Sequence, residues 1–93
     1  MRAVIKEPMK RAYIKDIPDT LEALQSIVGG HIECVDIAKY VTAIVDEEGR
    51  LKDKPANVLG FVGTICIVGT DGDEFTDLSL NAATACVQLL DDD

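Results

Sequence analysis

Four carboxylates lie close together late in the sequence and have the composition of a possible metal site: Asp71, Asp73, Glu74 and Asp77. Hard cations such as Ca²⁺ and Mg²⁺ bind several carboxylate oxygens from one short loop. When Asp71 is taken as position 1 of an EF-hand loop, Thr76 stands at position 6, where glycine is needed, and Ala82 at position 12, where glutamate is needed. The pattern favours a solvated acidic turn, and we expect neither a metal nor another cofactor.

The side chains needed for covalent catalysis are scarce. The chain has one histidine, His31, and three cysteines in separate apolar stretches, Cys34, Cys66 and Cys86. Widely spaced cysteines in an odd number favour neither a disulfide framework nor a zinc site. The single histidine belongs to no recognisable motif with a serine or cysteine nucleophile. We therefore expect buried thiols, an exposed histidine at the start of a strand, and no enzymatic activity.

Three glutamates are the remaining candidates for acid–base chemistry: Glu33, Glu47 and Glu48. Glu47 and Glu48 are neighbours in a segment with the composition of a turn, where both side chains point into water. A general acid or base needs a pKa that burial or a charged neighbour has shifted, and a solvated pair has neither. We expect no catalysis from these residues.

The charge of the chain is both negative and unevenly distributed. The formal net charge is −8, with five basic residues in 1–15 and seven acidic residues without a base in 71–93. An acidic protein is a poor ligand for phosphate backbones, so we expect no direct contact with nucleic acid. Two other roles remain open. The acidic surface could imitate nucleic acid, or the two charged ends could meet within one fold or between copies in a homo-oligomer.

Length and composition indicate one small globular domain. A chain of 93 residues with 47% hydrophobic and 28% charged residues can fold around a modest core. Its apolar stretches are too short to span a bilayer, and the N-terminus has no signal-peptide core, so we expect a cytoplasmic protein with no membrane contact. We place the domain at residues 1–90 and expect 91–93 to form a frayed acidic tail, because its carboxylates oppose the negative end of a helix.

The elements that must position these residues begin with a hairpin and a helix. Segments 3–6 and 12–17 are rich in β-branched residues and flank a loop containing Pro8, which predicts a β-hairpin at a sheet edge. A stripe of apolar residues at helical spacing then runs from Leu21 to Val28. Asp19 is the expected N-cap, and Gly29 and Gly30 are expected to end the helix.

The second half of the chain predicts three more strands and a second helix. Strands are expected at 32–37 and 40–45, followed by a turn at 46–49 in which Gly49 has positive φ and the chain returns at Arg50. An irregular loop covers 52–60, and the apolar segment 61–68 is expected to be the central strand. After a turn at 69–74, Asp77 or Ser79 caps a helix with Leu80, Ala83, Val87 and Leu90 on one face. The fold class is α+β, mainly an antiparallel sheet of about five strands with two helices, in the order β-β-α-β-β-β-α.

Several of these segments together resemble a known group of small proteins. The chain reads V-G-G-H-I-E at 28–33, D-E-E-G-R-L at 46–51, and Pro-x-Asn at 55–57. It thereby resembles an uncharacterised family, a domain of unknown function found in phages, plasmids, conjugative elements and Firmicutes, whose motifs are V-G-G-x-I-E and N/D-E-E-G-K/R-L. Asp46 stands where the family usually has asparagine, and Arg50 where it often has lysine.

The resemblance covers nearly the whole chain and implies a context, because the family has no catalytic residues to transfer. It implies an accessory protein of a mobile element. It also directs attention to the matching positions as a candidate binding surface: Glu33, Glu47, Glu48, Arg50 and Asn57.

The leading hypothesis is a non-enzymatic phage or mobile-element accessory protein that binds a host or element macromolecule, with a protein as the expected partner. A first alternative is an oligomer that sequesters a small anionic ligand, such as a signalling nucleotide, through Arg50, Lys52 and Lys54. A second alternative is an acidic nucleic-acid mimic that inhibits a host defence protein.

Overall fold

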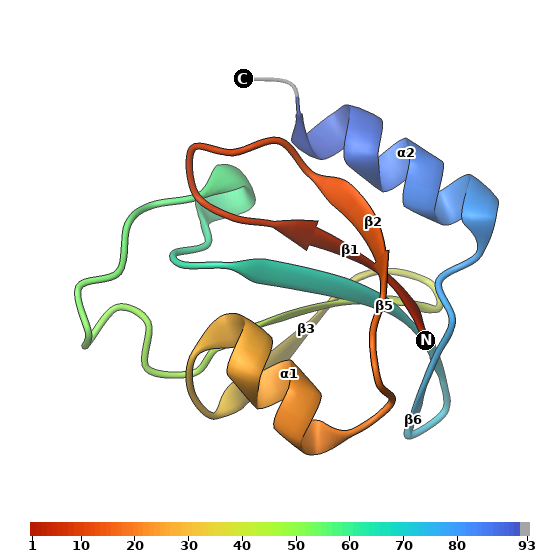
Figure 1. The fold of residues 1–93 in the computed structure, drawn as a ribbon, viewed down its shortest axis with the longest axis horizontal. Helices are drawn as coiled ribbons and strands as arrows, with labels where there is room; N and C mark the ends of the chain where they lie inside the picture. Colours follow the sequence, from red (N-terminus) through yellow and green to blue (C-terminus); the bar gives the residue numbers. More distant parts are fainter. Residues whose placement is uncertain (92–93) are drawn as a thin grey trace.

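The sheet is built around one apolar strand, β5 (Ile65–Asp71), in a computed structural model that describes residues 1–91 (Figure 1). The strand order is β2-β1-β5-β4-β3, and β6 pairs with the end of β5, so that the sheet has six strands, all paired antiparallel. The other strands are β1 (Arg2–Lys6), β2 (Tyr13–Asp16), β3 (Ile32–Ala38), β4 (Val41–Asp46) and β6 (Glu74–Thr76). The predicted α+β class and the central position of the late apolar strand are confirmed.

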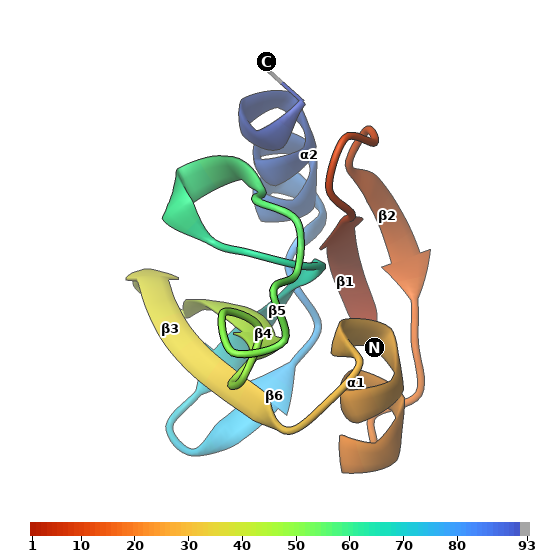
Figure 2. The same ribbon diagram turned by 90° about the vertical axis from the view of Figure 1, so that its left-hand side faces the viewer.

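One helix packs on each face of this sheet (Figure 2). Helix α1 (Leu21–Val28) contacts β3, β4 and β5, and helix α2 (Leu80–Leu90) contacts β1 and β2. Because successive side chains of a strand point to opposite faces, Ile65 and Ile67 of β5 join the core under α2, while Cys66 and Val68 join the core under α1. The sheet therefore separates two small hydrophobic cores.

The boundaries of α1 show how local chemistry and backbone conformation define a helix. Its N-cap is Thr20, whose Oγ1 accepts a hydrogen bond from the backbone N of Ala23 at 3.1 Å. The prediction of Asp19 as the cap is wrong by one residue, since it is Thr20 that has the extended backbone a cap requires. Gly29 ends the helix in the left-handed conformation with φ of 83°, as predicted.

Helix α2 begins as predicted at Ser79, whose Oγ accepts from the backbone N of Ala82 at 3.1 Å. Ala83 and Leu90 are buried, but Leu80 is 59% exposed, so its placement on the apolar face is wrong. Leu78 is buried instead, because the chain enters the helix with Leu78 against the core. Asp91 closes the helix, and residues 92 and 93 of the predicted tail lie outside the described part of the chain.

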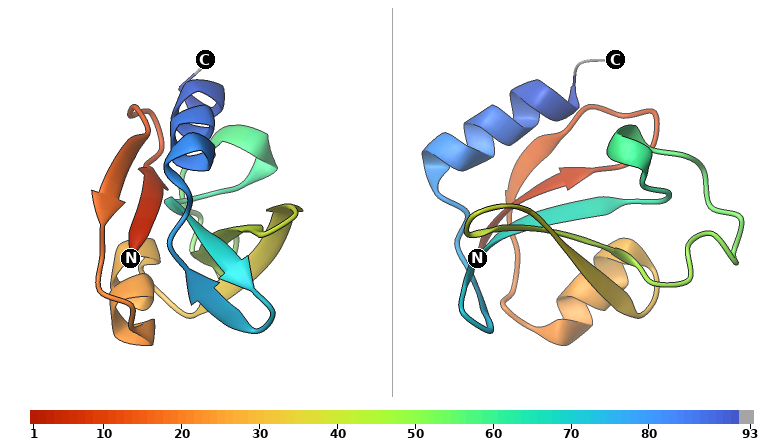
Figure 3. Two further views of the ribbon diagram at one scale, coloured as in Figure 1. Left: turned by 90° about the vertical axis from the view of Figure 1, so that its right-hand side faces the viewer. Right: turned by 180° about the vertical axis from the view of Figure 1, so that it is seen from behind.

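Two segments differ from the sequence-based expectation. Strand β5 continues to Asp71 and turns back at Gly72, with φ of 62°, into the additional strand β6 (Figure 3). Gly49 does not have positive φ, and no strand follows it: residues 47–64 form successive turns and a short 3-10 helix, η1 (Val58–Gly60). The chain leaves the sheet there because Asp46 accepts two hydrogen bonds from the turn that follows it. Its carboxylate accepts from Glu48 N, and its backbone carbonyl accepts from Gly49 N.

The cysteines differ in burial because Cys66 lies in the central strand, Cys34 in an edge strand and Cys86 in helix α2. Cys66 lies in the central strand, and burial raises the pKa of its thiol to about 12. Cys86 is half-buried, whereas Cys34 is exposed, which makes the prediction of a buried thiol wrong there, because β3 is an edge strand. His31 is exposed directly before β3, as predicted. Within residues 1–91, no helix is long and apolar enough to cross a bilayer.

Candidate functional site

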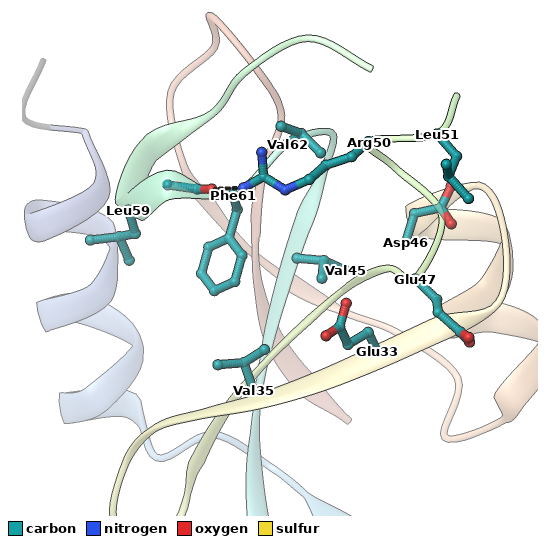
Figure 4. Close-up of a pocket in the computed structure, with 11 residues that line it drawn as sticks. Glu33, Val35, Val45, Asp46, Glu47, Arg50, Leu51, Leu59, Phe61 and Val62 are labelled. Carbon is teal, nitrogen blue, oxygen red and sulfur yellow. Dashed lines mark hydrogen bonds between the residues drawn. The ribbon is translucent and has the colours of Figure 1, made fainter. Parts of the chain in front are cut away.

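A cavity of about 270 Å³ opens beside the edge strand β3, on the face of the sheet that also carries α2 (Figure 4). Its floor comes from β3 and β4, and its opposite wall comes from the loop around η1. We call it the β3 cleft. Its walls combine apolar side chains with one cation and several carboxyl-bearing residues: Glu33, Val35, Val45, Asp46, Glu47, Arg50, Leu51, Leu59, Gly60, Phe61 and Val62.

Arg50 spans the top of the β3 cleft. Its Nη2 donates a hydrogen bond to the carbonyl oxygen of Gly60 at 2.9 Å, and the ring of Phe61 lies beneath the guanidinium and points into the cavity (Figure 4). Leu59 and Gly60 both have positive φ, 58° and 79°, and this pair of left-handed residues forms the turn that presents the carbonyl. Arg50 therefore holds the two sides of the loop together while its remaining N–H groups stay available for a ligand.

Asn57 fixes the loop that forms the wall. Its Nδ2 donates to the carbonyl oxygens of Lys6 at 2.9 Å and Gly63 at 2.7 Å, and its Oδ1 accepts from the backbone N of Val58 at 2.8 Å. These bonds tie the loop to the end of β1. Asn57 thus supports the site and does not line it.

The three predicted glutamates separate in space. Glu33 lies on β3 opposite Val45, and its carboxylate points into the β3 cleft, whereas the carboxylate of Glu47 points away from the cavity (Figure 4). Glu48 lies outside the cleft and contributes its backbone N–H to Asp46. Of the five predicted binding residues, the structure brings Glu33, Glu47 and Arg50 to one cavity and leaves Glu48 and Asn57 outside it.

Behind the cleft, a buried carboxylate joins the loop to helix α1. Asp46 is only 4% exposed, and its Oδ2 lies 2.8 Å from Lys52 Nζ and 2.6 Å from Lys54 Nζ. The hydrogen bonds from Lys52, then Lys54, hold the pKa of this carboxyl far below its usual range. The same ammonium groups donate to the last carbonyls of α1, Lys52 to Gly29 at 3.2 Å and Lys54 to Val28 at 2.7 Å.

This network explains why the chain has a glycine at position 30. A Cβ atom on Gly30 would lie 2.5 Å from Lys52 Nζ and 2.7 Å from Asp46 Oδ1, so a larger residue would displace the ion pair. Two lysines at the negative end of a helix are also favourably placed. Lys52 and Lys54 therefore act as structural cations within one copy of the chain, and an anion site formed by them with Arg50 in an oligomer stays a prediction.

The acidic residues at 71–77 do not form a metal site in the described part of the chain. Within residues 1–91, no group of three or more His, Cys, Asp or Glu side chains is arranged to hold a metal ion. Of the acidic cluster at 71–77, Asp77 accepts a hydrogen bond from the backbone N of Arg2 at 2.6 Å. The oppositely charged ends of the chain thus meet within one fold, and a homo-oligomer stays a prediction.

Sequence reasoning missed the apolar part of the β3 cleft. Leu51 is 85% exposed and Leu59 is 65% exposed, and both flank the cavity. The available signal was their occurrence in a polar, irregular loop, where a leucine has no helix or strand to pack against.

Comparison with known proteins gives one family: the model described as "Domain of unknown function (DUF3846)" matches residues 1–91. No curated protein and no solved structure matches the chain.

Proposed function

We propose, from the premise that the chain belongs to the DUF3846 family, that the protein acts by binding and not by catalysis, as a cytoplasmic accessory protein of a phage or mobile element. Its partner is a protein that presents an extended segment at the β3 cleft. The mobile-element context comes from the sequence resemblance alone. The binding mode comes from the geometry of β3.

The observation that carries the proposal is the unpaired edge of β3 next to an apolar cavity. Glu47 N donates to His31 O at 2.8 Å, and the register then places Glu33 and Val35 in the pairs that bond to β4. In an antiparallel ladder the intervening residues direct their backbone groups the other way. The outward-facing residues are Ile32, Cys34 and Asp36.

An added strand would use both features at once. Its backbone would pair with the outward groups of β3, and every second side chain would lie on the face that carries Glu33 and Val35, beside the β3 cleft. The side chains of Leu51 and Leu59, which flank the cavity, are exposed to solvent. Because full burial of one leucine side chain is worth about 1.5–3 kcal/mol, covering this pair would stabilise a complex considerably.

Charge defines the composition of the segment. The edge carries the acidic residues Glu33 and Asp36, and Glu47 and Glu48 follow close to it in the turn after β4. A complementary strand therefore alternates apolar residues with lysine or arginine. The nucleic-acid mimic would use the same acidic residues, and it stays a prediction from charge.

Selection of peptides from a random displayed library tests this binding mode. The expected result is enrichment of extended sequences that alternate apolar and basic residues. Cys34→Pro removes an outward N–H that is not part of the ladder, and Leu51→Ser with Leu59→Ser removes the apolar rim. Each should weaken binding of a selected peptide at least about tenfold, or about 1.4 kcal/mol.

Leu80→Ser is the matched control, because Leu80 is an exposed leucine on α2 and does not line the β3 cleft. Circular dichroism establishes that each variant is folded. The proposal would be overturned if no peptide were enriched, or if folded Cys34→Pro protein bound the selected peptide as tightly as the unaltered protein.

A further inference from the structure

A second cavity, of about 260 Å³, lies toward the opposite edge of the sheet from the β3 cleft, where the β1–β2 turn meets the end of α2. We call it the hairpin pocket. Three of the side chains that line it are cations, and one is a carboxylate: Lys6, Met9, Lys10, Arg11 and Asp91. In a chain with a net charge of −8, this is a local concentration of positive charge around a cavity.

Lys6 is the most unusual residue of the hairpin pocket, because it is a lysine with only 2% exposure. It lies in β1 two residues after Val4, on the side of the sheet that carries α2. Its Nζ donates to the carbonyl oxygen of Glu7 at 2.9 Å. An ammonium group has three donors, and a buried cation is unfavourable unless an anion or further acceptors surround it.

No carboxylate within residues 1–91 lies within 4.0 Å of Lys6 Nζ. The two other cations stand on the adjoining turn. Lys10 contacts Glu7 only across 3.8 Å, and both partners are substantially exposed. An exposed ion pair of this length contributes little, so Lys10 is free to face a ligand.

The chain already places one anion at this pocket. Asp91 Oδ1 accepts a hydrogen bond from the backbone N of Ala12 at 2.5 Å, although the two residues are 79 positions apart. The backbone N of Asp91 donates to Val87 O at 3.1 Å, which fixes the carboxylate at the end of α2. The backbone N–H of Ala12, next to the lining residue Arg11, therefore already serves as a donor to an oxyanion at the edge of the pocket.

We infer that the hairpin pocket binds a compact phosphomonoester, with Lys6, Lys10 and Arg11 contacting the phosphate and the carboxylate of Asp91 competing with it for the N–H of Ala12. A phosphate fits better than a second carboxylate, because it carries up to two negative charges and presents three oxygens to separate donors. The volume is slightly below that of usual ligand cavities, which restricts the remainder of the ligand to about the size of one nucleoside.

This site is independent of the β3 cleft and shares no lining residue with it. The sequence suggested a small anionic ligand at residues 50–54, where Lys52 and Lys54 bind Asp46. The inferred site for such a ligand lies instead at the N-terminal hairpin. It also requires only one copy of the chain.

Titration of ¹⁵N-labelled protein with inorganic phosphate and with adenosine 5′-monophosphate, at constant ionic strength, tests the inference. Saturable shifts of the amide signals of residues 10–12 are expected. Tighter binding of the nucleotide than of inorganic phosphate supports a pocket that also contacts the organic part, and saturable binding of inorganic phosphate alone supports recognition through the phosphate.

Three variants make the test specific. Arg11→Ala should weaken binding at least about tenfold. Asp91→Asn should tighten it severalfold, because the competing carboxylate loses its charge. Lys6→Met keeps the length of the side chain and should abolish binding without lowering Tm, because an apolar residue replaces a buried charge.

Lys39→Ala is the control, since it makes the same charge change as Arg11→Ala at an exposed residue that does not line the hairpin pocket. Shifts that do not saturate for either probe would overturn the inference. Equal loss of affinity in Arg11→Ala and Lys39→Ala, or unaltered affinity in Asp91→Asn, would also overturn it. None of these results bears on peptide binding at the β3 cleft.

Discussion

Replacing Asp46 by asparagine should destabilise the fold more than any other single loss of charge in the loops. The variant keeps the volume of the side chain and an oxygen for the N–H of Glu48, but it removes the negative charge between Lys52 and Lys54. Breaking a buried ion pair is strongly unfavourable, about 3–5 kcal/mol. In the variant both lysines keep their hydrogen bonds to carbonyl groups at the end of α1, and their side chains are 39% and 22% exposed. The loss of stability should therefore be smaller than for a fully buried pair.

We expect a loss of about 2 kcal/mol in the free energy of unfolding, from a total of about 5–15 kcal/mol for a domain of this size. At about 4–8 °C per kcal/mol for a domain of up to 100 residues, Tm should fall by about 8–16 °C. Urea denaturation followed by circular dichroism measures the first quantity, and a thermal scan measures the second. Asp53→Asn is the control, because it removes an exposed carboxylate from the same loop.

The pH dependence provides a second measurement on the same variant. The folded-state pKa of Asp46 is depressed far below the unfolded value of about 3.9. Its contribution to stability is therefore complete above about pH 4 and is lost as pH falls below that value towards the folded-state pKa. The difference between the unaltered protein and Asp46→Asn should narrow on acidification below about pH 4. The reasoning fails if Asp46→Asn is no less stable than Asp53→Asn at neutral pH, or if the difference is the same in acid.

Two further predictions concern the loop and the thiols. Asn57→Ala removes the hydrogen bonds to Lys6, Gly63 and Val58 and should cost about 2–3 kcal/mol, measurable by urea denaturation, with increased amide exchange in residues 57–63. An unchanged exchange pattern would contradict its supporting role. Burial raises the pKa of Cys66 to about 12, so its thiolate is absent at neutral pH. Mass spectrometry after alkylation of the native protein should find Cys34 labelled and Cys66 unlabelled, and rapid labelling of Cys66 would refute the central position of β5.

Several elements could be predicted because neighbouring residues determine them. The end of α1 follows from Gly29, which adopts positive φ without the strain that a Cβ would cause. The β1–β2 hairpin follows from two β-branched segments around a short loop. The central strand follows from a continuous apolar segment, which needs cover on both faces. In each case the controlling interaction lies within about one turn or one hairpin of the sequence.

Other features could not be predicted because they depend on packing. The turn at 46–49 has the composition of a hairpin, yet the interaction of Asp46 with Lys52 and Lys54 directs the chain away from the sheet. Cys34 lies in an apolar stretch, but its strand ends the sheet and nothing in 1–91 covers that side of it enough to bury the thiol. The ion pairs of Asp46 decide the first outcome, and the position of β3 at the edge of the sheet decides the second.

The sequence by itself determined one small acidic domain, its α+β class, and the approximate positions of both helices and most strands. The tertiary structure alone decided which of the candidate residues meet. It brought Glu33 and Arg50 into the β3 cleft, used Asn57 and Lys54 for support, and placed Asp91 against the N-terminal hairpin. The physical reason is that periodicity and turn chemistry act over a few residues, whereas the sites form where strands distant in sequence pair and their outward side chains share one face.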